Sequence, residues 1–160
     1  MVVSPVGVCS HAACTGQVGF YETGYQKGTS TGGQLKQYVS WRNINGMGDS
    51  IFVGDLNENQ LYNFEVSYNA GSGKWEAKRD GVVKHDIALD FSSGGEAFCG
   101  AEGVDLQFPV DPAIAVECSN MQYRNAAQIW TQYVYNATTT MRNNCVARVA
   151  PFGAITWGIC

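Results

Sequence analysis

The chain has 160 residues and a formal net charge of −4, and it carries no run of basic side chains. Because a phosphate backbone attracts clustered lysine and arginine, we expect no nucleic acid partner. No apolar run reaches the roughly 20 residues that a membrane-spanning helix needs, so we expect no membrane partner either.

Glycine is frequent and charge is sparse, with 19 glycines, 12% aromatic residues and 15% charged residues. This composition is typical of many short strands joined by tight turns. The length suits one domain covering residues 1–160, without a linker or an internal repeat. We predict an all-β fold: a two-sheet antiparallel β-sandwich of the jelly-roll type, stapled by disulfides, with a closed barrel as the alternative.

The first strands are predicted from alternating side chains. Residues 1–13 form a strand or loop held by Cys9, and residues 16–22 alternate so that Gln17 and Tyr21 share one face. Glycine-rich residues 24–33 predict a mobile connection. A second strand over residues 34–41 has Gln37 among branched and aromatic neighbours on its face.

Further strands follow a turn at residues 43–49. The expected ranges are 50–56, 61–68, 74–79 and 82–87, of which 61–68 has the clearest alternation. Asp80-Gly81 between the last two strands predicts a hairpin with a type I′ turn. We expect Trp75 on the core side and His85 as a solvated strand residue.

The last part of the chain predicts more strands and almost no helix. Strict alternation in the strand over residues 96–105 places the carboxylates of Glu96 and Glu102 on one face, unless a bulge intervenes. Two further strand-like runs cover residues 117–125 and 127–135. Residues 120–133 are the place where a helical pattern competes with this interpretation.

Six cysteines stand at positions 9, 14, 99, 118, 145 and 160. Their wide separations do not match zinc-ligand spacing, so we predict disulfides and a secreted protein. Six cysteines allow 15 pairings, and the sequence leaves these open. Asn136-Ala-Thr is an acceptor sequon, which fits a secreted glycoprotein.

Most catalytic motifs are absent from the sequence. There is no Gly-x-Ser-x-Gly, no phosphate-binding glycine loop and no His-Glu-x-x-His, and the chain has only two histidines. We therefore expect neither a metal nor a cofactor. The remaining candidates for a catalytic role are carboxylate and amide side chains.

Four short motifs follow one another within residues 9–105: Cys14-Thr-Gly-Gln17-Val-Gly-Phe20, Gln37-Tyr-Val-Ser-Trp41, Gly48-Asp-Ser-Ile51 and Cys99-Gly-Ala-Glu102. In this order they resemble the glutamic peptidases, of both the fungal acid-active and the neprosin-like kinds, which are two-sheet β-sandwiches. In the fungal kind, a strand that follows a cysteine supplies a catalytic glutamine. A Cys…Ala-Glu strand supplies the glutamate.

The resemblance implies an acid-active endopeptidase that hydrolyses polypeptides. Glu102 would be the general base and Gln17 the oxyanion donor, because a carboxylate beside an amide takes a proton from water while the amide N–H stabilises the oxyanion. The matching cysteines favour a Cys14–Cys99 bridge. The rival carboxylates are Glu96 and Glu22, and the candidates for substrate contact are Tyr21, Gln37 and Trp41.

Two other functions remain open from the sequence. A lectin-like, carbohydrate-binding sandwich without catalytic activity would bind a polysaccharide through a stacking platform of aromatic residues, with asparagine and glutamine to fix hydroxyls. The platform candidates are Tyr21, Tyr25, Tyr38, Trp41, Tyr62, Tyr68 and Trp75. An extracellular structural or assembly protein is the third possibility, suggested by the glycine-rich composition and the edge strands.

Overall fold

The computed structural model describes residues 2–10, 19–94, 96–99, 102–103, 116–118, 122–124, 127, 129–132, 146–150 and 153–157. The chain divides into two compact units. The first is Pro5–Phe98, and the second combines Met1–Ser4 with Cys99–Cys160. That the whole chain forms a single domain stays a prediction.

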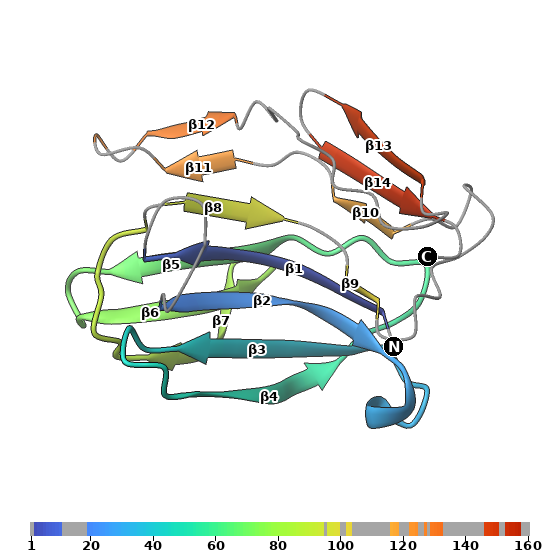
Figure 1. Cartoon of the computed structure of the whole chain (residues 1–160), viewed down its shortest axis with the longest axis horizontal. Helices are drawn as coiled ribbons and strands as arrows, with labels where there is room; N and C mark the ends of the chain where they lie inside the picture. Colours follow the sequence, from blue (N-terminus) through green and yellow to red (C-terminus); the bar gives the residue numbers. More distant parts are fainter. Residues whose placement is uncertain are drawn as a thin grey trace. The chain divides into compact units, whose positions relative to one another are not determined.

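Short strands make up nearly all the regular structure that is described (Figure 1). The strands are β1 (Val2–Cys9), β2 (Phe20–Lys27), β3 (Lys36–Arg42), β4 (Gly48–Asp55), β5 (Phe64–Asn69), β6 (Lys74–Arg79), β7 (Val82–Ile87), β8 (Glu96–Cys99), β9 (Glu102–Gly103), β10 (Val116–Cys118), β11 (Gln122–Arg124), β12 (Trp130–Gln132), β13 (Val146–Ala150) and β14 (Gly153–Trp157). The one helical element within the described ranges is a 3-10 turn, η2 (Thr29–Thr31). The predicted all-β fold is confirmed.

Two antiparallel sheets build the unit Pro5–Phe98. Sheet A has the strand order β4-β3-β2-β1-β8, and sheet B has the order β5-β6-β7. Their facing sides share one core of buried residues, in which Tyr21 and Val39 come from sheet A and Trp75 and Ala77 from sheet B. Phe91, from the segment after β7, closes this core at one end. The core position expected for Trp75 is confirmed.

The core lies between the sheets because each strand turns alternate residues inward. Half-buried apolar side chains surround the buried centre: Val8, Trp41, Val53, Val66, Tyr68, Ile87 and Leu89. Burying one large apolar side chain stabilises a fold by about 1.5–3 kcal/mol. Aromatic rings supply most of the volume, and Trp75 contacts the rings of Tyr21, Tyr68 and Phe91 at centroid distances of 6.4, 5.5 and 5.3 Å.

The hairpin of β6 and β7 has the predicted ends and the predicted turn. Asp80 has φ 52° and Gly81 has φ 77°. A type I′ turn needs positive φ at both central residues, and aspartate and glycine tolerate this best. The side chain of Asp80 also accepts a 2.9 Å hydrogen bond from the Asn63 N–H. This contact ties the turn to the start of β5.

Several predicted boundaries in the first half of the chain differ from the observed ones, and the differences at the end of β2 and the start of β5 are the largest. β2 continues to Lys27, although residues 24–33 were expected to form a mobile connection. Gly24 stays in the sheet because it pairs with the aromatic Tyr38 of β3. β5 begins at Phe64, while Leu61 is 96% exposed. β6 ends at Arg79, so the residues before Asn63 have no partner strand there.

The second unit contains small sheets. One has the order β10-β14-β13, and β11 pairs with β12. β9 pairs with the first residues of β1, where Glu102 lies opposite Val3. Residues 122–124 and 130–132 are strands, so the described part of the doubtful range 120–133 is not helical. Within the described residues, no helix is long and apolar enough to cross a membrane.

Candidate functional site

The proposed catalytic pair is described only in part. Gln17 and Cys14 lie outside the described residues, as does the sequon residue Asn136. Glu102 is the first residue of β9, and Glu96 is the first residue of β8. Only the backbone is described for these two strands. The roles of Gln17 and Glu102 therefore stay predictions.

Gly19, two positions after Gln17, is fixed by hydrogen bonds to Ser10. Ser10 and Gly19 exchange two hydrogen bonds: the Ser10 N–H donates to the Gly19 carbonyl (2.8 Å), and the Gly19 N–H donates to Ser10 Oγ (2.9 Å). Ser10 follows the last residue of β1, Cys9, which is disulfide-bonded. Val3, the partner of Glu102, is instead the second residue of β1. The rival carboxylates Glu22 and Glu96 need the same test as Glu102.

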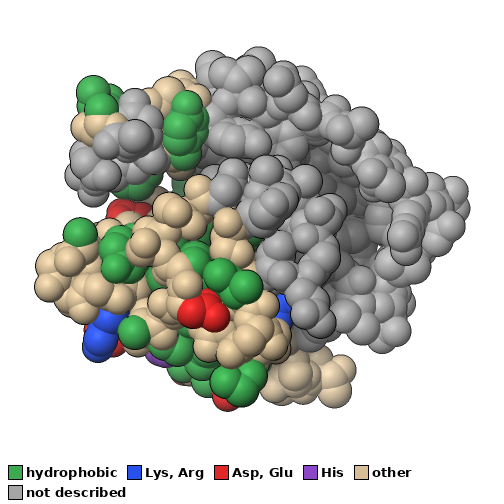
Figure 2. Space-filling model, turned by 60° about the vertical axis from the view of Figure 1, so that its left-hand side comes forward, with side chains coloured by type: hydrophobic (Ala, Val, Ile, Leu, Met, Phe, Trp, Pro, Cys, Tyr) green, Lys and Arg blue, Asp and Glu red, His purple; other side chains and the backbone are tan. Residues whose placement is uncertain are grey.

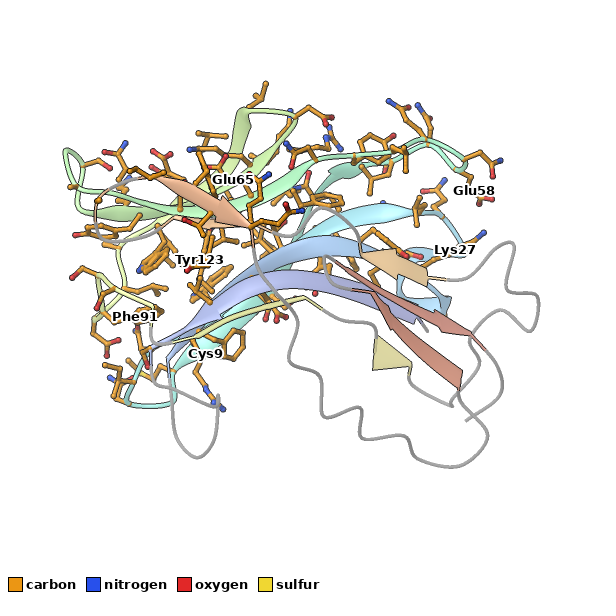
Figure 3. The ribbon with its side chains drawn as sticks, turned by 90° about the horizontal axis from the view of Figure 1, so that it is seen from above. Cys9, Lys27, Glu58, Glu65, Phe91 and Tyr123 are labelled. Atoms are coloured by element: carbon orange, nitrogen blue, oxygen red, sulfur yellow. The ribbon has the colours of Figure 1, made fainter. Side chains whose placement is uncertain are left out.

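The ring of Phe91 packs directly against Gly19. A Cβ atom at residue 19 would lie 2.7 Å from Phe91 Cε1 and 3.1 Å from the Arg42 carbonyl oxygen. Cβ atoms do not approach other atoms this closely, so only glycine fits here. Figure 3 shows Phe91 and Cys9 at one end of the unit Pro5–Phe98, with Lys27 and Glu58 at the other end. The residue that precedes β2 is thus packed at the Phe91 end.

Glu22 is the rival carboxylate whose side chain is described. It is half-buried on β2, and the hydroxyl of buried Tyr38 donates to its Oε1 at 3.4 Å. A hydroxyl bond of this length is weak, because O–H···O bonds are ordinarily 2.5–3.0 Å long. Glu22 is therefore partly withdrawn from water beside a phenol.

Gln37 is fully buried, and of the two polar atoms in its side-chain amide only the nitrogen has a hydrogen-bond partner among the described residues. Its Nε2 donates to Thr23 Oγ1 (3.1 Å), and this hydroxyl in turn donates to the Tyr38 carbonyl oxygen (2.8 Å). Because the single hydroxyl proton of Thr23 is already used, the amide nitrogen must face Thr23. Among the described residues, Gln37 Oε1 has no hydrogen-bond partner. The amide expected among branched and aromatic neighbours is in the core.

Tyr21, Trp41 and His85 form one cluster between the two sheets. The Tyr21 hydroxyl lies 2.9 Å from His85 Nδ1 and donates to the His85 carbonyl oxygen at 3.3 Å. The rings of Trp41 and His85 are stacked, with centroids 5.0 Å apart and planes at 19°. The prediction of a solvated His85 is wrong, because the bulge in β7 turns this residue into the cluster.

Burial shifts the pKa values of two residues in this cluster, Tyr21 and His85. It raises the pKa of the Tyr21 hydroxyl far above its ordinary value, and the nearby Asp86 carboxylate raises it further. Burial also lowers the pKa of His85, an effect that Asp86 opposes. Tyr21 therefore remains a neutral phenol, and His85 favours its neutral form.

The three residues predicted to contact a substrate differ in how deeply they are buried. Tyr21 and Gln37 are each 0% exposed, while Trp41 is half-buried against His85. Burial gives Tyr21 and Gln37 packing roles in the core. Their contact with a substrate stays a prediction from the resemblance.

Charged side chains on sheet B form a network that the sequence analysis missed. Lys78 Nζ donates to Glu65 Oε1 and Ser67 Oγ, both at 2.9 Å, and lies 3.2 Å from Glu76 Oε2. On the face in Figure 2, the described acidic and basic side chains are scattered and form no large patch of one sign. Among the described residues, no group of three or more histidine, cysteine, aspartate or glutamate side chains is placed to hold a metal ion.

A comparison with solved structures finds a protein of the same fold. It is the crystal structure of aspergilloglutamic peptidase from Aspergillus niger, which matches with a TM-score of 0.59 and 8% sequence identity. The match covers 99% of this chain and 98% of that chain. At this identity the likeness establishes the fold alone. No family model and no curated protein matches the sequence.

Proposed function

We propose that this protein is a secreted glutamic endopeptidase that hydrolyses peptide bonds of polypeptides in acid. The observation that carries the proposal is the fold match to a glutamic peptidase over 99% of the chain. The order of the four sequence motifs supports it, because the motifs place Gln17 and Glu102 where that family has its glutamine and glutamate.

The chemistry follows from the two side chains. The Glu102 carboxylate takes a proton from water, and the water oxygen forms a bond to the scissile carbonyl carbon. The amide N–H of Gln17 stabilises the negative charge on the carbonyl oxygen. Glu102 then returns the proton to the amide nitrogen as the carbon–nitrogen bond breaks. This cycle needs neither a metal nor a cofactor.

Acid favours this mechanism if the carboxyl group is withdrawn from water. Removal from water raises the pKa of a glutamate, because it disfavours the charged form. A group that first accepts and then donates a proton works best when its pKa lies near the working pH. We therefore expect the highest activity at acidic pH.

The test is hydrolysis of an unfolded protein substrate from pH 2 to 8. Glu102→Gln keeps the shape and removes the proton acceptor, so it should abolish turnover while circular dichroism shows an intact fold. Gln17→Ala should raise the barrier by about 2.7–4 kcal/mol, the cost of losing one oxyanion donor. Glu22→Gln and Glu96→Gln are matched controls that should keep activity. Activity that survives Glu102→Gln but not one of the controls would move the base to that residue.

The carbohydrate-binding alternative is less well supported. All seven aromatic residues considered for a stacking platform are buried or half-buried: Tyr21, Tyr25, Tyr38, Trp41, Tyr62, Tyr68 and Trp75. A platform needs exposed ring faces, and these rings pack instead. An absence of hydrolysis at every pH, together with retention on a polysaccharide column, would nevertheless favour this function.

A further inference from the structure

The Tyr21 hydroxyl links the two sheets of the unit Pro5–Phe98. Tyr21 lies on β2 of sheet A and is fully buried, whereas both groups of His85 that it contacts belong to β7 of sheet B. A buried hydroxyl that loses its hydrogen-bond partners destabilises the fold. His85 therefore helps to hold β2 in place, and β2 is the strand that follows Gln17.

A bulge in sheet B positions His85 for this contact. The register of β6 and β7 shifts between Ala77, which pairs with His85, and Lys78, which pairs with Val83. Lys84 is thus the extra residue on β7. A bulge re-aims neighbouring side chains, and here it brings the imidazole between the rings of Tyr21 and Trp41.

The hydrogen bonds can accommodate two protonation states of His85. A neutral ring can accept the Tyr21 hydroxyl proton at Nδ1. When the ring is positively charged, Nδ1 carries a proton and donates to the Tyr21 oxygen, and the hydroxyl turns to the His85 carbonyl oxygen. Protonation therefore breaks no required hydrogen bond. Its cost is the placement of a positive charge on a half-buried ring.

The charges around the cluster offset only part of that cost. Asp86, next to His85 on β7, favours the charged ring, but its carboxylate already pairs with Lys74 at 2.9 Å. On β6, Glu76 acts on the Tyr21 hydroxyl. On sheet A, Trp41 is uncharged, and its register partner Asp49 on β4 is exposed.

We propose that His85 is a proton-sensitive positioning residue: through the Tyr21 hydroxyl it holds β2 against sheet B, and a proton on its half-buried imidazole makes this folded arrangement less stable without breaking the link. The link itself is independent of the proposed function. Its influence on hydrolysis rests on that function, because Gln17 precedes β2.

The sign of the pH effect follows from the cost of the charge. Burial lowers the pKa of His85 in the folded state, so the unfolded chain binds the proton more readily. The contribution of His85 to stability is complete above about pH 6.5, the ordinary value for histidine. It is lost as the pH falls through the lower, folded-state pKa.

Three variants distinguish the effect of protonating His85 from the effect of losing its contacts with Tyr21 and Trp41. His85→Asn offers an amide near the position of Nδ1 and does not titrate. His85→Phe keeps the stack on Trp41 and removes the nitrogen atoms. Tyr21→Phe keeps the ring and removes the hydroxyl. The melting temperature of each variant is measured from pH 4.5 to 8, beside the wild-type protein.

We expect the wild-type melting temperature to fall from pH 7 to pH 5, and both His85 variants to lose that part of the slope. Each unit by which the folded-state pKa is lowered changes the unfolding equilibrium constant tenfold. A His11→Gln background leaves His85 as the only imidazole, so proton NMR can follow it alone. Its midpoint should lie below about 6.5.

The proposal is overturned if the pH profile of His85→Asn runs parallel to that of the wild type. A His85 midpoint at or above about 6.5 would overturn it as well. Neither measurement involves hydrolysis. A protein without peptidase activity would therefore contradict the proposed function, while the melting and NMR measurements would still decide whether protonation of His85 destabilises the folded protein.

Discussion

The indole N–H of Trp75 donates a 2.7 Å hydrogen bond to the carbonyl oxygen of Phe91. Both residues are buried, and they come from different parts of the chain: Trp75 from β6 and Phe91 from the segment after β7. The bond holds the Phe91 ring over Gly19 at the end of the core. Sheet B, the closing segment and the start of β2 thus depend on one another.

Trp75→Phe should lower the free energy of unfolding by about 2–4 kcal/mol. The change leaves the Phe91 carbonyl oxygen buried without its donor, at a cost of about 1–3 kcal/mol, and it also removes buried ring surface. Urea denaturation measures the difference. Leu61→Ala, at a residue that is 96% exposed, should change stability by no more than about 0.5 kcal/mol. Equal effects of the two substitutions would contradict the role of the bond.

Gly19→Ala should destabilise the protein by about 1–3 kcal/mol, the usual cost of overpacking a core. The new methyl group would meet Phe91 Cε1 at 2.7 Å. In a Phe91→Leu background the same substitution should cost less, because the opposing ring atoms are gone. A double-mutant cycle by urea denaturation measures this coupling. Strict additivity would show that the two residues do not meet.

Gly81→Ala should cost about 1–2 kcal/mol, because residue 81 has φ 77° and a Cβ atom makes this left-handed conformation unfavourable. Asp80→Asn is the matched control. Asparagine keeps an acceptor for the Asn63 N–H and tolerates positive φ. Its stability in urea should stay within about 0.5 kcal/mol of the wild type. A harmless Gly81→Ala would be incompatible with the type I′ turn.

Asn69→Asp should raise the pKa of Glu76. The Asn69 side chain donates to Glu76 Oε1 at 2.7 Å, and this hydrogen bond, with that from Lys78, holds the pKa of Glu76 below its ordinary value. Aspartate keeps the acceptor for the Gly71 N–H and removes the donor. Carboxyl-carbon NMR titration measures the shift, with Asn57→Ala as a distant control.

The same substitution should change stability in acid. Because the folded-state pKa of Glu76 is lowered, its contribution to stability is present above about pH 4.5 and is lost as the pH falls through the lowered value. The variant should therefore lose less stability than the wild type on acidification below pH 4.5. An unchanged acid profile would count against the Asn69 bond.

Peptide mapping without reduction should recover Cys14 joined to Cys99. The prediction rests on the resemblance, in which each of these cysteines stands beside one of the two catalytic residues. A bridge over such a long loop would stabilise the fold by about 4 kcal/mol in the chain-entropy model. Recovery of either cysteine in another pair would remove the support that this bridge gives to the proposed site.

Local sequence determined the strand content and one whole hairpin. Alternating side chains and glycine-rich turns act within a few residues, so β6, β7 and the turn at Asp80 and Gly81 could be predicted with their correct ends. The order of the motifs similarly predicted the fold that the structure shares with a glutamic peptidase. Gln17 and Glu102 remain predictions from that order alone.

Only the tertiary structure decided which residues meet across the two sheets. β2 extends to Lys27 because β3 pairs along its length. The sequence around Gly24 does not indicate that this residue has a partner strand. His85 is half-buried because the bulge in β7 turns it toward Tyr21, which lies 64 positions earlier in the chain. Gly19 must be glycine because of Phe91, which is similarly distant in sequence. Such contacts depend on packing between distant segments, and alternation within one strand carries no information about them.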